Sequence, residues 1–506
     1  MMRLCLFVLL LCMVIGVSAA EYKDDQLNLE INLAAESSIM LKALNPNSGM
    51  HISEGDGLFS SILMGNISIS VVNQESLSYF GILLNKLVGE ATPGDSLAVV
   101  REYFAWEHNR LLIKHELLYF DEHSFSSFEA AEMYAAKMRI PKGKIMEIPV
   151  INSTVKISND RGETIYLETP LRIESDGLKV NNGSLSFDGA FVLKTVKNKL
   201  VLNHLLPLED YLAGVIQNEI GNSSPVEALK AQAVAARTHA LSLLINNRHK
   251  ADGFDLCSST HCQVYKGKYL QNESILNAVR DCSSEALFID GNIADATYHS
   301  SCGGKTDSSS VIWKGKPVSH LNGVTCIADA DSLDLSRERI ARQWIDTKSS
   351  SEGMSSWERG ALSWDKSISL NKLADNVGLS FINEIVIVSR GRSGRITAMK
   401  FSGNKEVRLD NEYKIRQAFD NTLSSFFYIK GAYHESGDNI VINPRGSVHL
   451  KGKGAGHGVG MCQVGALRMA REGKTYKEIL QQYYPGTELK YDWMEAEPYF
   501  QMLDAE

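Results

Sequence analysis

The first half of this sequence has almost no cysteine. Cys5 and Cys12 lie in the apolar start of the chain, and the next cysteine is Cys257. A disulfide scaffold spreads its cysteines through a short secreted chain, so it is excluded as the basis of this 506-residue fold. One disulfide, between Cys282 and Cys326, stays open as an alternative. The six later cysteines are Cys257, Cys262, Cys282, Cys302, Cys326 and Cys462.

The sequence also lacks an excess of positive charge. Its formal net charge is −8 at pH 7, whereas a nucleic-acid-binding protein needs a basic patch. We therefore expect no nucleic-acid partner. Low-complexity tracts are absent as well. An HExxH zinc-hydrolase pattern is missing, which argues against a zinc amidase or peptidase.

Residues 1–20 have the layout of a secretory signal peptide. Arg3 precedes an apolar run, and Val-Ser-Ala-Ala at 17–20 offers small residues for cleavage. The apolar run is too short for a secure membrane anchor. We therefore expect an exported protein, in the periplasm or cell envelope, with no membrane span after cleavage of the signal.

The remaining chain predicts an α+β protein. Residues 21–150 are interpreted as a smaller mixed α/β module, with a helix at 124–138 that has either a glycan-binding or a packing role. Residues 151–490 form the main domain, with mixed strands and helices around a groove. Within it, 330–370 is polar and helical or irregular, and 491–506 is a C-terminal tail.

Glu219 precedes the clearest helix signal in the chain. We predict that it lies in a loop, and that a helix runs over 225–246, with Ser224 as its N-cap and Glu227 completing a capping box. A partly desolvated carboxyl group has a raised pKa, which suits it to donate a proton. Arg237 lies about three turns into the helix, either on a solvated face or lining a groove where it binds substrate oxygens.

A loop rich in cysteine and histidine follows this helix. Cys257, His261 and Cys262 fall within six residues, and His249 precedes them. Thiolates and imidazoles suit four-coordinate zinc. We expect a closed, structural zinc site with His249 as the fourth ligand, and His299 and Cys302 as competitors for that position.

Two further motifs combine histidine with glycine. In TYHSSCGGKT, His299 and Ser300 precede a Gly-Gly pair that lets backbone approach a ligand closely, although a hydrogen-bonded turn histidine explains it too. In GAGHGVGMCQVGA, His457 lies in a glycine-rich loop that ends at a helix. A phosphate loop would need a following Lys-Ser/Thr, which is missing. A wall for a polar polymer fits this loop better.

Taken together, five segments closely resemble the SpoIID/LytB family, which acts on peptidoglycan. They are LPLEDYLAGVIQNEI, SPVEALKAQAVAARTHA, FDLCSSTHCQVYKG, YHSSCGGKT and GHGVGMCQVGALRMA. The resemblance covers about residues 150–490, with a less typical stretch at 327–380. Two positions depart from the family pattern: Cys462 stands where many relatives have Ser, and His239 replaces a common Tyr.

The resemblance implies a lytic transglycosylase. Glu219 matches the family's catalytic acid and base, which cleaves the bond between N-acetylmuramic acid and N-acetylglucosamine to give 1,6-anhydro products. The preferred substrate is a glycan strand stripped of peptides. The alternative is a non-catalytic glycan-binding activator of a cell-wall amidase. Our candidates for sugar contacts are Arg237, Gln263, Tyr265, His299, Ser300, His457 and Gln463.

Overall fold

A computed structural model describes residues 27–45, 48–54, 60–87, 97–107, 110–125, 132–133, 145–267, 273–437, 439–491 and 493. The expected signal peptide, most of the expected helix at 124–138, and the C-terminal tail after 493 lie outside these residues. The chain divides into two compact units. The first holds the residues up to 211 together with 243–268, and the second holds 212–242 and 269–492.

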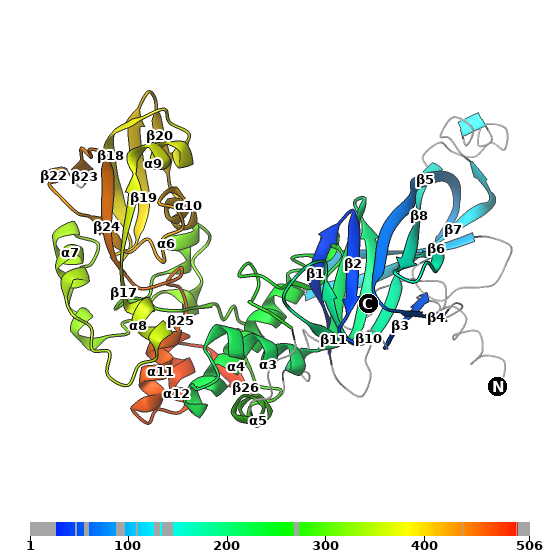
Figure 1. The fold of residues 1–506 in the computed structure, drawn as a ribbon, viewed down its shortest axis with the longest axis horizontal. Coiled ribbons are helices and arrows are strands. Elements are labelled where there is room, and N and C mark those ends of the chain that lie inside the picture. The colour runs from blue at the N-terminus through cyan, green and yellow to red at the C-terminus, as the bar shows by residue number, and fades with distance from the viewer. Residues whose placement is uncertain are drawn as a thin grey trace. The chain divides into compact units, whose positions relative to one another are not determined.

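The first unit is built on a large, mostly antiparallel sheet (Figure 1). Its central order is β13-β1-β12-β11-β10-β2-β5-β7-β6, while β3, β4, β8 and β9 pair outside this path. The strands are β1 (Asn28–Glu36), β2 (Ser38–Ala43), β3 (Gly49–Glu54), β4 (Ser60–Met64), β5 (Ile67–Leu87), β6 (Leu97–Glu107), β7 (Arg110–Phe125), β8 (Ile145–Asn159), β9 (Thr164–Glu168), β10 (Leu171–Val180), β11 (Phe187–Val196), β12 (Lys199–Pro207) and β13 (Leu256–Cys257).

The domain boundary predicted near residue 150 is wrong. Strand β8 crosses that position without a break and pairs with β5 over fifteen residue pairs. β1 pairs with β12, which joins the start of the described chain to residues 199–207. Alternating apolar residues such as Ile31, Leu200 and Leu202 bury one face of these strands. Strand pairing between distant segments leaves no mark in the local sequence, so this boundary could not be located from the sequence.

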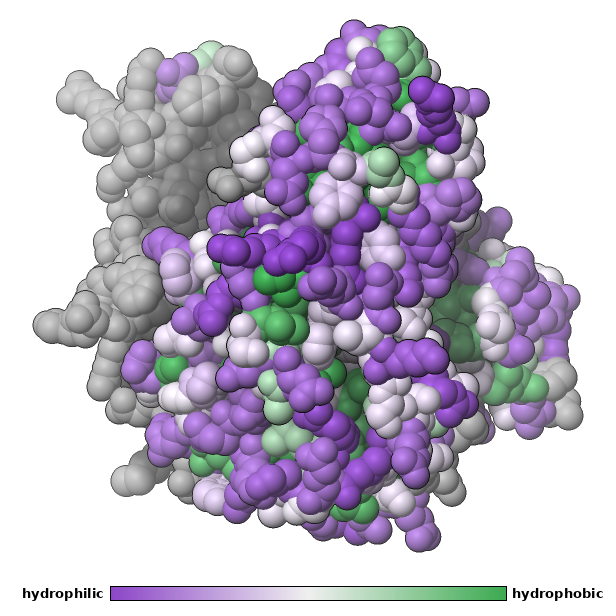
Figure 2. Space-filling model, turned by 90° about the vertical axis from the view of Figure 1, so that its left-hand side faces the viewer, coloured by the Kyte–Doolittle hydropathy of each residue, from purple (hydrophilic) through white to green (hydrophobic). Residues whose placement is uncertain are grey.

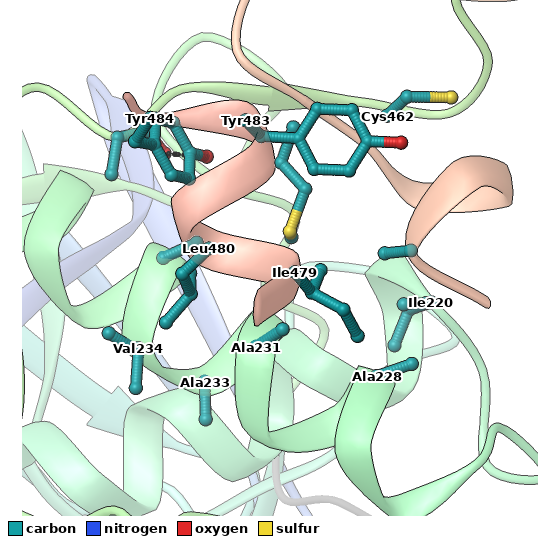
Figure 3. Close-up of a cluster of buried hydrophobic side chains, with 14 of the residues drawn as sticks. Ile220, Ala228, Ala231, Ala233, Val234, Cys462, Ile479, Leu480, Tyr483 and Tyr484 are labelled. Carbon is teal, nitrogen blue, oxygen red and sulfur yellow. Dashed lines mark hydrogen bonds between the residues drawn. The ribbon is translucent and has the colours of Figure 1, made fainter. Parts of the chain in front are cut away.

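The helices of the second unit surround a core made largely of small side chains. They are α3 (Leu208–Glu219), which begins in the first unit, α4 (Val226–Ile245), α5 (Glu273–Asp281), α6 (Ser309–Trp313), α7 (Glu338–Asp346), α8 (Ser356–Leu362), α9 (Leu370–Val377), α10 (Glu412–Ala418), α11 (Gln463–Arg471) and α12 (Tyr476–Tyr483). Helix α4 is buried on almost every face, and its alanines allow close approach of neighbours. Ile479 and Leu480 of α12 point toward α4 (Figure 3).

The strands of this unit form four small sheets. They are β14 (Ala286–Ile289) with β15 (Asn292–Ile293) and β26 (Glu488–Lys490); β16 (Tyr298–His299) with β25 (Met461–Cys462); β17 (Ser363–Ser369) with β24 (Ser447–Lys453) and β21 (Phe427–Ile429); and β18 (Ile382–Arg390) with β19 (Ile396–Gly403), β20 (Glu406–Leu409), β22 (His434–Ser436) and β23 (Asn439–Ile442). Segregated sheets and helices make the fold α+β, as predicted.

The atypical stretch at 327–380 is anchored through a buried ion pair. Glu338 of α7 accepts from Arg390 of β18 at 2.6 Å and from Arg342 at 2.7 Å. These two arginines lower the pKa of Glu338 despite its burial, so the carboxylate stays charged.

In Figure 2, apolar colour forms small separate patches on a mostly hydrophilic face. Among the described residues, no helix combines the length and apolar character needed to cross a membrane.

Candidate functional site

Glu219 is the last residue of helix α3, not part of the following loop as predicted. Its side chain is half-buried. The turn that follows contains Gly221, whose φ of +91° suits glycine and ends the helix. The next residue, Ile220, is fully buried in the core that also contains Val459 and Cys462. Glu219 is therefore next in sequence to a residue of the core that supports the motif around His457.

Helix α4 begins at Val226, one residue later than predicted. The Ser224 hydroxyl donates to the Ile220 carbonyl at 2.9 Å, which ties the turn back to α3. The Glu227 carboxylate accepts from the amide of Tyr476 at 2.7 Å, at the start of α12. The predicted capping-box residues thus hold neighbouring elements together around the end of α3.

The two histidine-glycine motifs lie side by side, a contact that the sequence did not predict. β16 pairs in parallel with β25, in the register His299 with Cys462. Ser301 and Ala455 form an antiparallel bridge between the same two segments. Val464 donates its amide to the Ser300 carbonyl at 3.0 Å, beside the start of α11. Segments about 160 positions apart in the sequence therefore lie together, and we call the surface that they form the wall.

His457 is neutral and held by the backbone. Its Nε2 lies 2.9 Å from the Tyr298 carbonyl, and its Nδ1 accepts from the Val459 amide at 3.1 Å. Burial lowers the pKa of His457 well below its ordinary value, and His299 and Arg395 lower it further. Both ring nitrogens already have hydrogen-bond partners. The half-buried imidazole can therefore contact a ligand through the face of its ring, but not as a proton donor or acceptor.

Trp313, which the sequence analysis missed, packs against this ring. The two ring centroids are 5.3 Å apart, and Trp313 is 42% exposed. An exposed tryptophan usually marks a contact surface, because its large ring is costly to leave in water. No local pattern singles out Trp313, since it ends a short helix far from His457 in sequence.

Five of the predicted sugar-contact residues are buried, and each has a side-chain polar atom bonded inside the protein. Arg237 is fully buried and donates to the Glu285 carbonyl at 3.0 Å. Gln463 donates to Gln232 at 3.1 Å, and His299 is 4% exposed with Nδ1 on the Val459 carbonyl. In this conformation these side chains lie in the interior of the protein and not on the exposed surface of the wall. Gln263 and Tyr265 are buried in the first unit, on Tyr211 and His204 respectively.

The Cys/His loop gathers the four residues predicted for zinc. The ligand atoms of His249, Cys257, His261 and Cys262 all lie within 4.8 Å of one another. Cys262 Sγ is 3.3 Å from His249 Nε2, and Cys257 Sγ is 3.7 Å from His261 Nδ1. Two thiols and two imidazoles at this separation fit a closed tetrahedral zinc site.

The surroundings of this loop favour a thiolate and an oriented imidazole. Hydrogen bonding from Cys262 lowers the pKa of Cys257 far below that of a free thiol. His249 Nδ1 lies 3.2 Å from the Asp252 carboxylate, the outer-shell contact typical of a metal-binding histidine. His261 Nε2 lies 2.8 Å from Arg248, so a metal at Nδ1 requires this arginine to move away.

The predicted competitors for the fourth zinc position lie elsewhere. His299 and Cys302 belong to the second unit, whereas the Cys/His loop is in the first. The possible disulfide between Cys282 and Cys326 is also wrong. All six described cysteines are free, and Cys282 contacts the Ala278 carbonyl while Cys326 groups with Cys302 and Cys462.

Comparison of this sequence with known proteins finds a matching family and several relatives. The model for Stage II sporulation protein, SpoIID, matches residues 196–288, which include Glu219, α4 and the Cys/His loop. An uncharacterized protein of Brachyspira hyodysenteriae is 30% identical over 330 residues, covering 64% of this chain and 77% of that protein. The chain belongs to the SpoIID/LytB family.

Two further relatives come from Bacillus subtilis. The amidase enhancer is 32% identical over 55% of this chain, which spans only 40% of that longer protein. Stage II sporulation protein D is 27% identical over 56% of this chain and 74% of its own length. A domain of unknown function matches residues 307–460, which include the atypical stretch and His457.

Proposed function

We propose that this protein is an exported lytic transglycosylase of the cell envelope that cleaves peptidoglycan glycan strands. The observation that carries the proposal is the position of Glu219. It is a half-buried carboxyl group at the end of α3, attached through Ile220 to the core beneath the two histidine-glycine motifs.

In the proposed reaction, one carboxyl group acts twice. Glu219 donates its proton to the oxygen of the bond between N-acetylmuramic acid and N-acetylglucosamine, and the C1–O bond breaks. The 6-hydroxyl of the same muramoyl residue attacks C1, and Glu219 takes up the proton that this hydroxyl loses. The products are a 1,6-anhydromuramoyl end and a free 4-hydroxyl on N-acetylglucosamine. A second carboxylate, which ordinary glycosidases need, is not required.

The exposed parts of the wall are suited to sugar binding. Trp313 and the face of His457 present adjacent flat rings, which pack against the C–H faces of sugar rings. Ser300 is half-buried on the same wall. The buried His299 joins the two segments of this surface through the Val459 carbonyl, whereas Arg237 and Gln463 lie in the interior. We propose that the Cys/His loop binds zinc, which stabilises the loop without taking part in the reaction.

The test is digestion of purified glycan strands, with and without their stem peptides. We expect 1,6-anhydro products by mass spectrometry, with a greater yield from peptide-stripped strands. Fully reducing ends instead of anhydro ends would indicate a hydrolase and contradict the proposal.

A second candidate function is supported by similarity to the amidase enhancer. In that case the wall binds glycan and stimulates an amidase without cleaving the strand. Adding a cell-wall amidase to the same assay separates the two functions. Stimulated peptide release with an intact glycan backbone would favour the enhancer.

A further inference from the structure

Three buried thiols meet in the second unit, away from the Cys/His loop. The Sγ atoms of Cys302, Cys326 and Cys462 all lie within 4.8 Å of one another. Their residues are 2%, 7% and 2% exposed, so solvent has little access to them. They come from three separate segments: the turn after β16, the loop before α7, and the N-terminus of α11. Neither the proposed reaction nor the Cys/His loop uses them.

Backbone amides point at these sulfur atoms. Cys462 Sγ accepts from the Cys302 amide at 3.2 Å and from the Gly465 amide at 3.3 Å. Cys302 Sγ accepts from the Gly304 amide at 3.3 Å. The Cys462 sulfur also caps α11, where the helix dipole favours negative charge. The amide donors and the helix N-terminus favour negative charge on the Cys462 sulfur, and the thiolate is the form that binds metals.

His299 offers a fourth donor next to this cluster, although only the three thiol sulfurs all lie within 4.8 Å of one another. His299 pairs with Cys462 across β16 and β25, so the two side chains leave the sheet on the same face. Its Nδ1 lies 3.0 Å from the Val459 carbonyl, which fixes the proton there and leaves Nε2 with a lone pair. Among the described residues, this buried Nε2 has no hydrogen-bond partner. An imidazole held by a backbone carbonyl is the usual arrangement of a metal-binding histidine.

We infer that Cys302, Cys326, Cys462 and His299 form a second, structural zinc site. A disulfide would use two of the three thiols and leave the third beside it, whereas one ion uses all three. Three thiolates and one imidazole are a common donor set for structural zinc. Gly465 leaves the necessary room, because a Cβ there would lie 2.4 Å from Cys326 Sγ. The ion would join the two histidine-glycine motifs to the loop that carries Cys326.

Metal content of the full chain tests this inference. The double variant Cys257→Ser/Cys262→Ser removes both thiols of the Cys/His loop. We expect one equivalent of zinc in this variant by native mass spectrometry, independent of any activity on glycan. Adding Cys326→Ser should remove that equivalent. Adding Cys282→Ser should not, because Cys282 is equally buried in the same core but lies outside the cluster.

Two further measurements distinguish the loss of a metal site from the failure of a variant to fold. The double variant loaded with cobalt should show a thiolate-to-metal charge-transfer band, and His299→Gln in the same background should weaken zinc retention against a chelator at least tenfold. A double variant without metal would overturn the inference. So would a mass 2 Da lower under non-reducing conditions, which would show a disulfide in the cluster.

Discussion

Arg395 Nη1 lies 2.8 Å from the carbonyl oxygen of Cys302. The same guanidinium donates from Nη2 to the carbonyls of Ser301, at 3.2 Å, and Gly456, at 3.3 Å. Arg395 is fully buried and immediately precedes β19. Its side chain joins the two histidine-glycine motifs. We consider it the main internal support of the candidate site.

Replacing this arginine should destabilise the second unit. Arg395→Met keeps much of the side-chain volume but removes a donor from three backbone carbonyls, of which, among the described residues, only that of Ser301 keeps another, the Ala455 amide. Hydrogen bonds to a charged group contribute about 1.5–3 kcal/mol, so we expect a loss of at least that size in the free energy of unfolding. Urea denaturation measures it. Arg408→Met, on the exposed strand β20, is the control and should change little. Equal midpoints for both variants would contradict this role.

The glycine-rich loop needs Gly458 because of the same arginine. A Cβ at Gly458 would lie 2.3 Å from Arg395 Cζ, and its φ is +82°. Gly458→Ala therefore combines a clash with the left-handed strain of about 1–2 kcal/mol. Gly473→Ala is a matched control, with φ +84° and no atom within 4 Å of the added Cβ. Thermal unfolding should show the larger loss for Gly458→Ala, and a similar loss for both would show that Arg395 is easily displaced.

The sequence predicted much of the local structure around the site. Helix α4 and the helix after Cys462 occur where periodicity and the glycine-rich loop placed them. The sequence also singled out His299 and His457, but not the pairing of their two motifs. It could not show that Gln463, Arg237 and Gln263 are buried, because a polar residue looks the same in sequence whether its partner is a ligand or a distant backbone group. Trp313 and the Cys302 cluster depend on the same long-range contacts.

Lys453, the last residue of β24 just before the glycine-rich motif, should make stability depend on pH. It is 2% exposed, and its Nζ donates to the Thr347 carbonyl at 2.8 Å and to Ser349 at 3.0 Å. Burial, with a contribution from Lys451, lowers its pKa from 10.5 to about 8. Between these values the unfolded chain binds more protons, so stability should rise from about pH 8 to 10.5.

Unfolding midpoints of the wild type and Lys453→Met across this range test the effect. The difference between the two proteins should change with pH above 8, with the wild type gaining relative to the variant. Below pH 8 both states of the wild type are protonated, so the difference should be constant. A constant difference over the whole range would show that Lys453 keeps an ordinary pKa.

Trp313 should affect glycan binding more than catalysis. Aromatic contacts contribute about 0.5–1.5 kcal/mol, so Trp313→Ala should raise KM up to about tenfold while kcat changes little. Phe381→Ala, at another exposed aromatic residue, is the control and should leave both constants unchanged. A loss of kcat with unchanged KM would place Trp313 at the reacting bond instead.

The most direct measurement of the central claim is the yield of anhydromuramoyl products from peptide-stripped glycan, compared between Glu219→Gln and Glu209→Gln. Both acids lie on α3 and are half-buried, so the second variant controls for loss of a carboxylate from this helix. We expect Glu209→Gln to retain activity. Glu219→Gln should lose at least a hundredfold, the smallest usual contribution of general acid–base catalysis, while its unfolding midpoint stays within the wild-type range. Undiminished anhydro products from folded Glu219→Gln would contradict the account.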